Sequence, residues 1–172
     1  MVIKCFVQMD INKKKVLFID LDDTLIKTVS GDTFPRDVTD FQIRKEVVDK
    51  IRSLQGLQRV AIVSNQGGIP EYTAEEDFKA KMKAIEFFIF VYCNVAVSSH
   101  YCADKDKDNP RRKPNTGMFD EVVETLPRAL RKKECMLMVG DASGKEGDFS
   151  NSDREAAENF DIDYLDVNDF IL

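Results

Sequence analysis

The stretch VLFIDLDDTL at residues 16–25 decides the fold of this chain. It begins with four apolar residues, which is typical of a strand buried on both faces in a parallel sheet beneath helices. Asp20 and Asp22 follow, and side chains two residues apart in an extended segment point the same way, about 7 Å apart along the backbone. Two like charges that converge are costly unless a cation or a shared proton relieves them. The acids are therefore either a turn signal that ends the strand or part of a cation site.

The composition is that of a soluble globular protein. The chain has 172 residues, of which 43% are hydrophobic and 33% charged, so we expect a single domain over residues 1–172. The net charge of -6 provides no overall attraction to nucleic acid. The apolar stretch 87–97 is too short to cross a membrane, and the first residues lack the apolar core of a signal peptide. We therefore expect a cytoplasmic enzyme without a membrane partner.

Apolar runs alternate along the chain with segments of helical periodicity. The runs predict strands at residues 16–21, 59–64, 88–97, 135–140 and 162–166, and the periodic segments predict helices at 43–55, 73–86, 116–132 and 152–159. Two capping-box pairs, Thr73 with Glu76 and Ser152 with Glu155, mark helix starts. This alternation implies an α/β fold with a Rossmann-like, doubly wound parallel sheet.

Two polar segments interrupt the alternation. Residues 27–42 contain Gly31 and Pro35, so we expect a small flap or hairpin after the first strand, too short to form a large cap domain. Residues 104–110 are polar and alternate in charge, which is typical of a solvated loop.

The second predicted strand ends in SNQGG at residues 64–68. Ligands of parallel sheets gather at the carboxyl ends of the strands. The hydroxyl of Ser64, the amides of Asn65 and Gln66 and the backbone of Gly67 are therefore candidates for substrate binding, because such a turn can present N–H groups to an anion. Taken alone, the same residues are simply a good loop.

The sequence RRKP at residues 111–114 supplies positive charge just before a predicted helix. A run of this kind is usually a solvated basic loop. We favour a binding role for Arg112 and Lys113, because a lysine held at the junction of a strand and a helix can neutralise a phosphate and a carboxylate together.

The fourth predicted strand ends in MLMVGD at residues 136–141, which puts another acid at the carboxyl end of a strand. Asp141 would join Asp20 and Asp22 around a hard cation. Mg²⁺ takes oxygen ligands and keeps several waters, so two or three carboxylates with a substrate oxygen suffice. Asp153, at the start of the last predicted helix, is either a further metal ligand or a carboxylate favoured by the helix dipole.

These patches, in this order, resemble the haloacid dehalogenase superfamily of phosphatases. The matching residues are DLDDT at 20–24, Ser64, Lys113 and GD at 140–141. The resemblance implies that Asp20 attacks phosphorus and forms an aspartyl-phosphate, while Asp22 protonates the leaving oxygen and then activates water. It also implies that Ser64 and Lys113 hold the phosphoryl oxygens. Mg²⁺ would then lie between Asp20, the backbone carbonyl of Asp22 and Asp141.

Within the superfamily, the chain after residue 14 is most similar to the 3'-phosphatase domain family of polynucleotide kinase/phosphatase. The similarity is carried by FIDLDDTLI at 18–26, FP at 34–35 with DF at 40–41, SNQGGI at 64–69, SH at 99–100, RKP at 112–114 with GM at 117–118, GDA at 140–142, DFS at 148–150 with Asp153, and DFIL at 169–172. That family removes 3'-phosphates from damaged DNA ends. The resemblance thus implies a phosphomonoester at a nucleic-acid 3' end as substrate, and a site left open to a polymer end by the missing cap.

Three departures from the family pattern bear on this interpretation. The chain has no G-x-x-x-x-G-K-[ST] motif, so a kinase half with its phosphate-cradling loop is absent, and a separate kinase or ligase partner stays unproven. Asp23 stands where many members have Gly, although Asp is tolerated in tight turns. The loop at 104–109 is mixed in charge, which predicts few phosphate contacts and a shallow salt dependence for DNA binding.

Two alternative functions stay open. A small-molecule phosphatase of the histidinol-phosphate or heptose-bisphosphate type shares RKP and GM, but those relatives carry a zinc loop before that motif. This chain offers only His100, Cys102 and the distant Cys93, too few and poorly spaced for tetrahedral zinc, and its cysteines are more typical of free thiols. The other alternative is a non-catalytic binding domain on the same fold. The presence of both the acids and the lysine argues against it.

Overall fold

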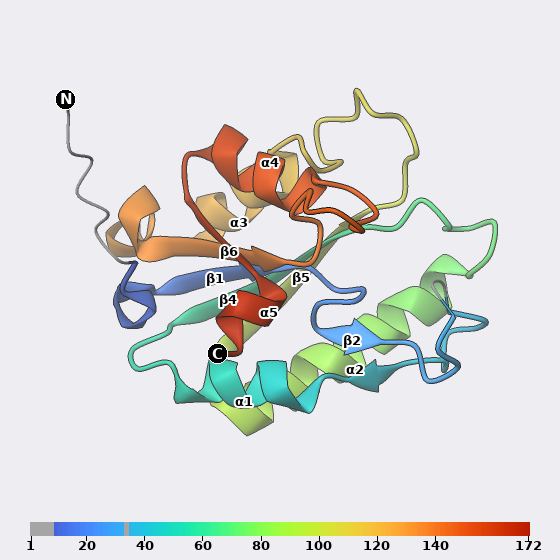
Figure 1. Ribbon diagram of the computed structural model, residues 1–172, viewed down its shortest axis with the longest axis horizontal. Coiled ribbons are helices and arrows are strands. Elements are labelled where there is room, and N and C mark those ends of the chain that lie inside the picture. The colour runs from blue at the N-terminus through green and yellow to red at the C-terminus, as the bar shows by residue number, and fades with distance from the viewer. Residues whose placement is uncertain (1–8, 33–34) are drawn as a thin grey trace.

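The computed structural model describes residues 9–32 and 35–172, and its centre is the strand β1 (Val16–Ile19). β1 belongs to a five-stranded sheet in the order β5-β4-β1-β6-β7, in which every neighbouring pair is parallel (Figure 1). The other strands are β4 (Arg59–Asn65), β5 (Ala96–Cys102), β6 (Met136–Gly140) and β7 (Asp163–Asp166). The prediction of an α/β fold with a parallel Rossmann-like sheet is therefore confirmed.

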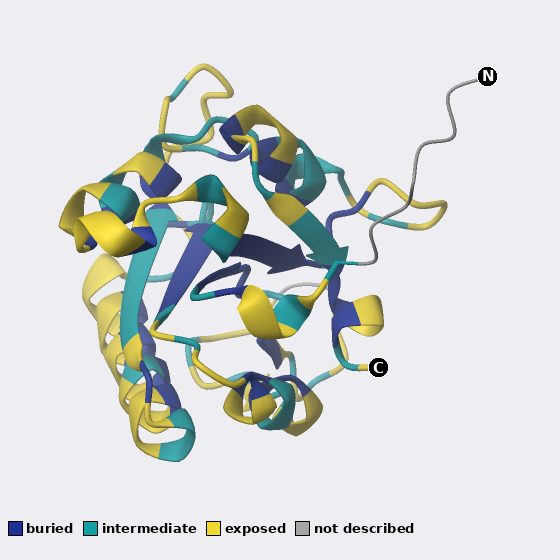
Figure 2. Ribbon diagram, turned by 90° about the vertical axis from the view of Figure 1, so that its left-hand side faces the viewer, coloured by how far each residue is buried: buried dark blue, intermediate teal, exposed yellow. Residues whose placement is uncertain are grey.

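Helices cover both faces of this sheet. On one face lie α1 (Lys45–Ser53), α2 (Glu75–Cys93) and α5 (Val167–Phe170), and on the other lie α3 (Gly117–Thr125) and α4 (Ser152–Phe160) (Figure 1). Successive β1 side chains point to opposite faces, so Leu17 and Ile19 join the core with α1 and α2, whereas Val16 and Phe18 join the core with α3 and α4. The central strands β1, β4 and β6 are almost entirely buried, whereas β5 and β7 at the edges are mostly of intermediate exposure (Figure 2). Short 3₁₀ helices lie at η1 (Ile11–Lys13), η2 (Arg128–Leu130) and η3 (Lys133–Cys135).

The predicted strand at residues 88–97 is wrong. Helix α2 continues to Cys93, and the strand β5 begins only at Ala96. The buried residues of α2 recur at helical spacing: Phe78, Lys81, Met82, Ile85 and Ile89. Four other large apolar side chains of the helix are exposed: Phe87, Phe88, Phe90 and Val91. Helix α2 is covered on one side only, yet it carries apolar residues on its exposed side as well. The final part of its sequence is therefore continuously apolar, which is also the pattern of a strand buried on both faces.

Helix boundaries and caps also differ from the prediction. The helix predicted at 116–132 ends at Thr125, because Leu126 is extended before Pro127, as residues that precede proline usually are. The capping boxes are wrong in detail, since α2 begins after Ala74 and α4 begins after Asn151, and neither start has a side-chain cap. Local pattern thus located the starts of these helices to within two residues, but not their caps and not the ends of α2 and α3.

A small hairpin follows β1, as predicted. Strand β2 (Ile26–Lys27) pairs antiparallel with β3 (Gln42–Ile43), and the connecting loop is held by Asp40, which accepts hydrogen bonds from the backbone and hydroxyl of Ser30 at 2.8 and 2.6 Å. The hydrogen bonds from Ser30 and from the backbone of Arg36 lower the pKa of Asp40 to about 2. Phe34 of the FP motif and Cys5 lie outside the described residues.

The described cysteines and helices bear on two further expectations. Cys93, Cys102 and Cys135 are free thiols, as predicted. In the described part of the chain, none of the helices combines the length and the apolar character that crossing a membrane requires.

Replacing Phe18 should destabilise the fold. Its ring stacks on Phe119 with centroids 4.6 Å apart and meets Phe160 edge-on at 6.1 Å. Phe18→Ala leaves a cavity and should lower the free energy of unfolding by about 3–5 kcal/mol, measured by urea denaturation. The matched control is Phe87→Ala, which removes an exposed ring and should change it by less than about 0.5 kcal/mol. Equal losses in the two variants would contradict the assignment of the core.

Candidate active site

The candidate site lies at the carboxyl edge of the three central strands. Because β4, β1 and β6 are parallel neighbours, their carboxyl ends meet at one edge. Asp20 directly follows β1, Ser64 is the next-to-last residue of β4, and Asp141 directly follows β6. Lys113 comes from the loop before α3, and Asp153 comes from the first turn of α4.

Lys113 is the buried cation of this site. Its Nζ atom donates to Oδ1 of Asp20 at 2.5 Å, to Oδ1 of Asp153 at 2.7 Å and to the carbonyl of Val63 at 2.8 Å. Burial lowers the pKa of Lys113, but the adjacent carboxylates of Asp153 and Asp20 outweigh it and raise the pKa above its ordinary value. Lys113 is therefore charged, and it bridges acids from two different elements.

Asn65 holds the main chain of Lys113 in place. Its side-chain Nδ2 donates to the carbonyl of Lys113 at 2.9 Å, and its Oδ1 accepts from the backbone N–H of Lys113 at 2.9 Å. The lysine is preceded by a loop that carries no helix or strand, so this pair of hydrogen bonds ties the loop to the end of β4. Asn65, predicted as a substrate-binding residue, thus positions the cation in this structure.

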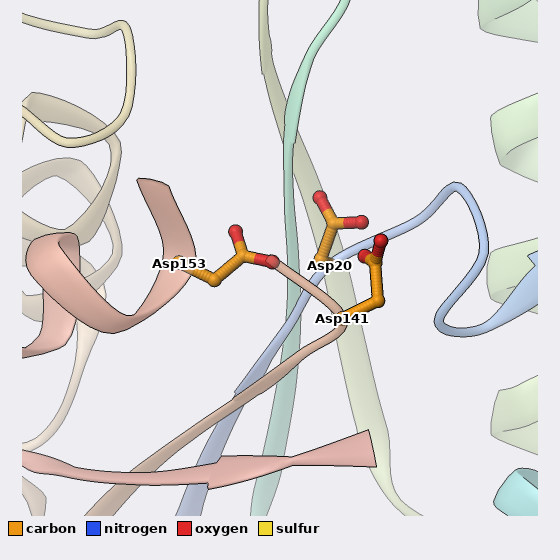
Figure 3. Close-up of side chains that lie close together, drawn as sticks. All are labelled: Asp20, Asp141 and Asp153. Atoms are coloured by element: carbon orange, nitrogen blue, oxygen red, sulfur yellow. The ribbon is translucent and has the colours of Figure 1, made fainter. Parts of the chain in front are cut away.

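Three carboxylates converge beside Lys113. Oxygens of Asp20, Asp141 and Asp153 all lie within 4.8 Å of one another, and Figure 3 shows the three side chains approaching a common point. Burial, together with the charges of Asp153, Asp141 and Asp22, raises the pKa of Asp20 despite the opposing effect of Lys113. Burial and the charge of Asp153 raise the pKa of Asp141 to about 6. Such closely spaced oxygen donors match the preference of Mg²⁺, whereas structural zinc sites favour sulfur and nitrogen ligands.

Gly140 and Thr24 allow this convergence. A Cβ atom on Gly140 would overlap the carboxylate of Asp153, so only glycine leaves room for that side chain. The hydroxyl of Thr24 donates to Oδ1 of Asp141 at 2.9 Å and accepts from the backbone N–H of Asp141 at 2.9 Å. The sequence analysis did not assign Thr24 a role, although its place just after the acid pair was a signal that it belongs to the site.

Asp22 contacts the loop after β4. Its Oδ2 accepts from Nε2 of Gln66 at 2.5 Å, and the same Nε2 donates to Oγ of Ser64 at 2.8 Å. Asp22 is absent from the group of described acids that could share one ion. Its side chain as a fourth metal ligand stays a prediction, and its contact with Gln66 connects it to the predicted phosphate-binding loop.

Asp23 adopts the conformation that glycine would otherwise provide. Its φ of 54° lies in the left-handed region, which Asp tolerates better than most residues. Nη1 of Arg44 donates to the Asp23 carbonyl at 2.7 Å. The departure from the family pattern at this position is thus compatible with the turn.

Arg112 lies next to Gly67. A Cβ on Gly67 would be 3.6 Å from Nη1 of Arg112, and that Nη1 donates to the carbonyl of Asp104 at 2.8 Å. The structure therefore brings these two predicted substrate-binding residues side by side.

Comparison with known proteins agrees with this arrangement. A family model for the polynucleotide kinase 3 phosphatase matches residues 15–170. The bifunctional polynucleotide phosphatase/kinase of Schizosaccharomyces pombe is 35% identical over 92% of this chain, which spans only 38% of that protein's length. A Thermoplasma volcanium protein that carries the name of a D-glycero-D-manno-heptose-1,7-bisphosphate 7-phosphatase is 31% identical over 79% of this chain and 91% of its own.

A solved structure supports the fold. The D,D-heptose 1,7-bisphosphate phosphatase of B. bronchiseptica, complexed with magnesium and phosphate, aligns with a TM-score of 0.64 at 17% identity, covering 88% of this chain and 78% of its own. At that identity the likeness concerns the fold alone.

The fold and the sequence matches together define a phosphatase of the haloacid dehalogenase type. More particularly, the chain belongs to the polynucleotide kinase 3 phosphatase family.

Asp141→Asn should stabilise the metal-free protein at neutral pH. Because the pKa of Asp141 is raised to about 6, the folded state loses stability as the pH rises from about 4 through 6, and a neutral Asn avoids that loss. Its Oδ1 can still accept from Thr24. After discounting for partial exposure we expect about 1 kcal/mol, or about 2–4 °C in Tm, measured by thermal unfolding in EDTA.

This gain should vanish near pH 4, and added Mg²⁺ should stabilise the wild type more than the variant. A lower Tm for the variant in EDTA at neutral pH, or a gain that persists at pH 4, would contradict the electrostatic account.

Proposed function

We propose that this chain is a Mg²⁺-dependent phosphomonoesterase that removes the 3'-phosphate from polynucleotide ends. The observation that carries the proposal is the contact of the buried cation Lys113 with Asp20 at 2.5 Å and with Asp153 at 2.7 Å. A carboxylate cannot readily approach a phosphate dianion unless positive charge lies between them, and Lys113 supplies that charge next to the proposed nucleophile.

Asp20 is the proposed nucleophile. One of its carboxylate oxygens attacks phosphorus, the bond from phosphorus to the ester oxygen breaks, and Asp22 delivers a proton to that departing oxygen. The product alcohol leaves, and the phosphoryl group stays on Asp20 as an aspartyl-phosphate. The contact of Asp22 with Gln66 at 2.5 Å keeps the proton donor beside the loop that would hold the phosphoryl oxygens.

Hydrolysis of the aspartyl-phosphate regenerates the enzyme. A water molecule attacks phosphorus while Asp22, now a carboxylate, takes one of its protons. The bond between phosphorus and the Asp20 oxygen breaks, and inorganic phosphate is released. Ser64, Gln66 and the backbone at Gly67 would hold the phosphoryl oxygens during both steps, together with Lys113.

The proposed metal ligands are the carboxylates of Asp20, Asp141 and Asp153, whose oxygens lie within 4.8 Å of one another. The backbone carbonyl of Asp22 is a further proposed ligand on the strength of the family resemblance. Bound Mg²⁺ would neutralise negative charge on the phosphoryl group and on the acids.

The polynucleotide substrate is supported by the family and by the open architecture of the described residues. Between β1 and α1 the described chain forms only the small hairpin β2–β3, so no large cap is seen over this edge in residues 9–32 and 35–53. Phosphorylation of the 5' end would depend on another chain or segment, because this sequence has no P-loop motif.

A small-molecule phosphatase is the second candidate, favoured by the heptose-bisphosphate relative. Against it, each of the three residues that could supply a zinc loop has another partner, and that of the Cys102 thiol is the carbonyl of Asp104 at 3.8 Å. His100 contacts Glu121 at 3.1 Å, and the thiol of Cys93, which donates to the carbonyl of Val48, lies on the other side of β5 in helix α2.

A substrate panel tests the proposed function. We expect Mg²⁺-dependent phosphate release from an oligonucleotide 3'-phosphate, with kcat/KM at least about tenfold higher than for histidinol phosphate or heptose bisphosphate, since a buried recognition contact is worth about 1–3 kcal/mol. Asp20→Asn should reduce release from every substrate to background. Equal or higher kcat/KM on the small substrates would remove the polynucleotide assignment, and undiminished turnover by Asp20→Asn would remove the nucleophile.

Asp22→Asn should separate the two chemical steps. The p-nitrophenolate leaving group needs little protonation, so the first step should survive and yield a burst of p-nitrophenol equal to the enzyme concentration. Steady-state turnover should then fall by about 10²–10⁴-fold, because no base activates water. An oligonucleotide 3'-phosphate, whose leaving alkoxide needs the proton, should show no burst. A burst of equal size with both substrates would exclude Asp22 as the proton donor.

A further inference from the structure

The loop that follows β4 carries an exposed aromatic ring close to the proposed active site. Two tight turns bring the chain from Gln66 to Tyr72, with the N–H of Ile69 donating to the carbonyl of Gln66 at 3.1 Å and the N–H of Tyr72 donating to that of Gly68 at 2.7 Å. Gln66 itself contacts Asp22. The Tyr72 side chain is therefore one short loop away from the proposed proton donor, and it is 75% exposed.

Gly67 and Gly68 leave space in this loop, because they have no side chains to fill the region near Tyr72 and two basic residues. A Cβ on Gly68 would lie 3.4 Å from Cδ2 of Tyr72, and a Cβ on Gly67 would lie 3.1 Å from Cγ of Lys105. That Cβ would also be 3.6 Å from Nη1 of Arg112, the residue just before the buried Lys113. Side chains larger than glycine would fill this space.

The cations remain close to solvent and close to the ring. Nζ of Lys105 lies 5.7 Å from the centroid of the Tyr72 ring and pairs with Glu71 at 2.5 Å. Nη1 of Arg112 donates to the carbonyl of Asp104 at 2.8 Å, and the described residues show no hydrogen bond from its other guanidinium N–H groups, which can therefore donate to a phosphate. Lys105 is exposed and Arg112 is partly exposed.

An exposed ring flanked by basic side chains is the composition that binds single-stranded nucleic acid, in which bases stack on the ring and cations follow the backbone. We propose that Tyr72, Lys105 and Arg112 form a subsite for the nucleotide that precedes the 3'-phosphorylated end. The base of this nucleotide stacks on Tyr72, and its phosphate lies against Lys105 and Arg112. This inference rests on the proposed function, since it concerns the same substrate.

Two consequences follow for the substrate. A base can offer its face to Tyr72 only when it is unstacked from its neighbour, so the Tyr72 subsite favours single-stranded or frayed 3' ends over blunt duplex ends. Lys105 and Arg112 face a single phosphate, and Glu71 lies beside Lys105, so this subsite should raise log Kd with log salt by a slope of about 0.7, the value for one phosphate of a single strand.

The test compares an oligothymidylate 3'-phosphate with thymidine 3'-monophosphate, which lacks the preceding nucleotide. For Tyr72→Ala we expect the KM for the oligonucleotide to rise about tenfold, the size of one base–aromatic stack, with kcat maintained. The ratio of kcat/KM between the two substrates should fall by the same factor. Tyr72→Phe should restore the wild-type ratio, Lys105→Ala should lower it, and Phe87→Ala, which removes an exposed ring on α2, is the matched control.

The results of these assays test the Tyr72 subsite and the proposed polynucleotide 3'-phosphatase function separately. A wild-type protein with no preference for the oligonucleotide overturns both. A wild-type preference that Tyr72→Ala and Lys105→Ala leave intact overturns the subsite and keeps the function. Equal kcat/KM on single-stranded and blunt duplex 3'-phosphates overturns the stacking of an unpaired base, whereas a preference for the single strand that Tyr72→Ala abolishes supports it.

Discussion

The bridge from Lys113 to Asp20 and Asp153 is the interaction on which the rest of the site depends. Carboxylate oxygens of Asp20, Asp141 and Asp153 lie within 4.8 Å of one another, and bringing such charges together in a buried place is unfavourable. Lys113 offsets part of that cost through its contacts with Asp20 and Asp153. The remaining excess of negative charge is what makes the site suited to a divalent cation.

The parallel sheet brings these charged side chains together. Because β4, β1 and β6 end at one edge, side chains far apart in sequence meet there without any long excursion of the chain. The same packing buries Asp20 and raises its pKa. The folded protein therefore holds its acids in an electrostatically unfavourable arrangement that a bound cation would relieve, at a cost in stability of the metal-free form.

Much of the fold could be predicted from local pattern, and the failures have a common cause. The run at 16–19 is apolar on both faces because β1 is central, so its strand prediction holds. The same rule fails for the apolar run at 88–97, because Phe88, Phe90 and Val91 are exposed on a helix and periodicity cannot tell an exposed apolar residue from a buried one. Caps fail because a Ser or Thr near a helix start does not by itself show which backbone N–H it would reach.

The sequence by itself determined that Asp20 and Asp22 follow a buried strand, that Ser64 and Asp141 stand at other strand ends, and that the chain alternates strand and helix. Only the tertiary structure decided their partners. Lys113 reaches Asp153, Asp22 turns toward Gln66, and Tyr72 comes to lie beside Lys105. These contacts depend on strand order and loop path, which follow from long-range packing, whereas pattern and spacing report only what neighbouring residues do.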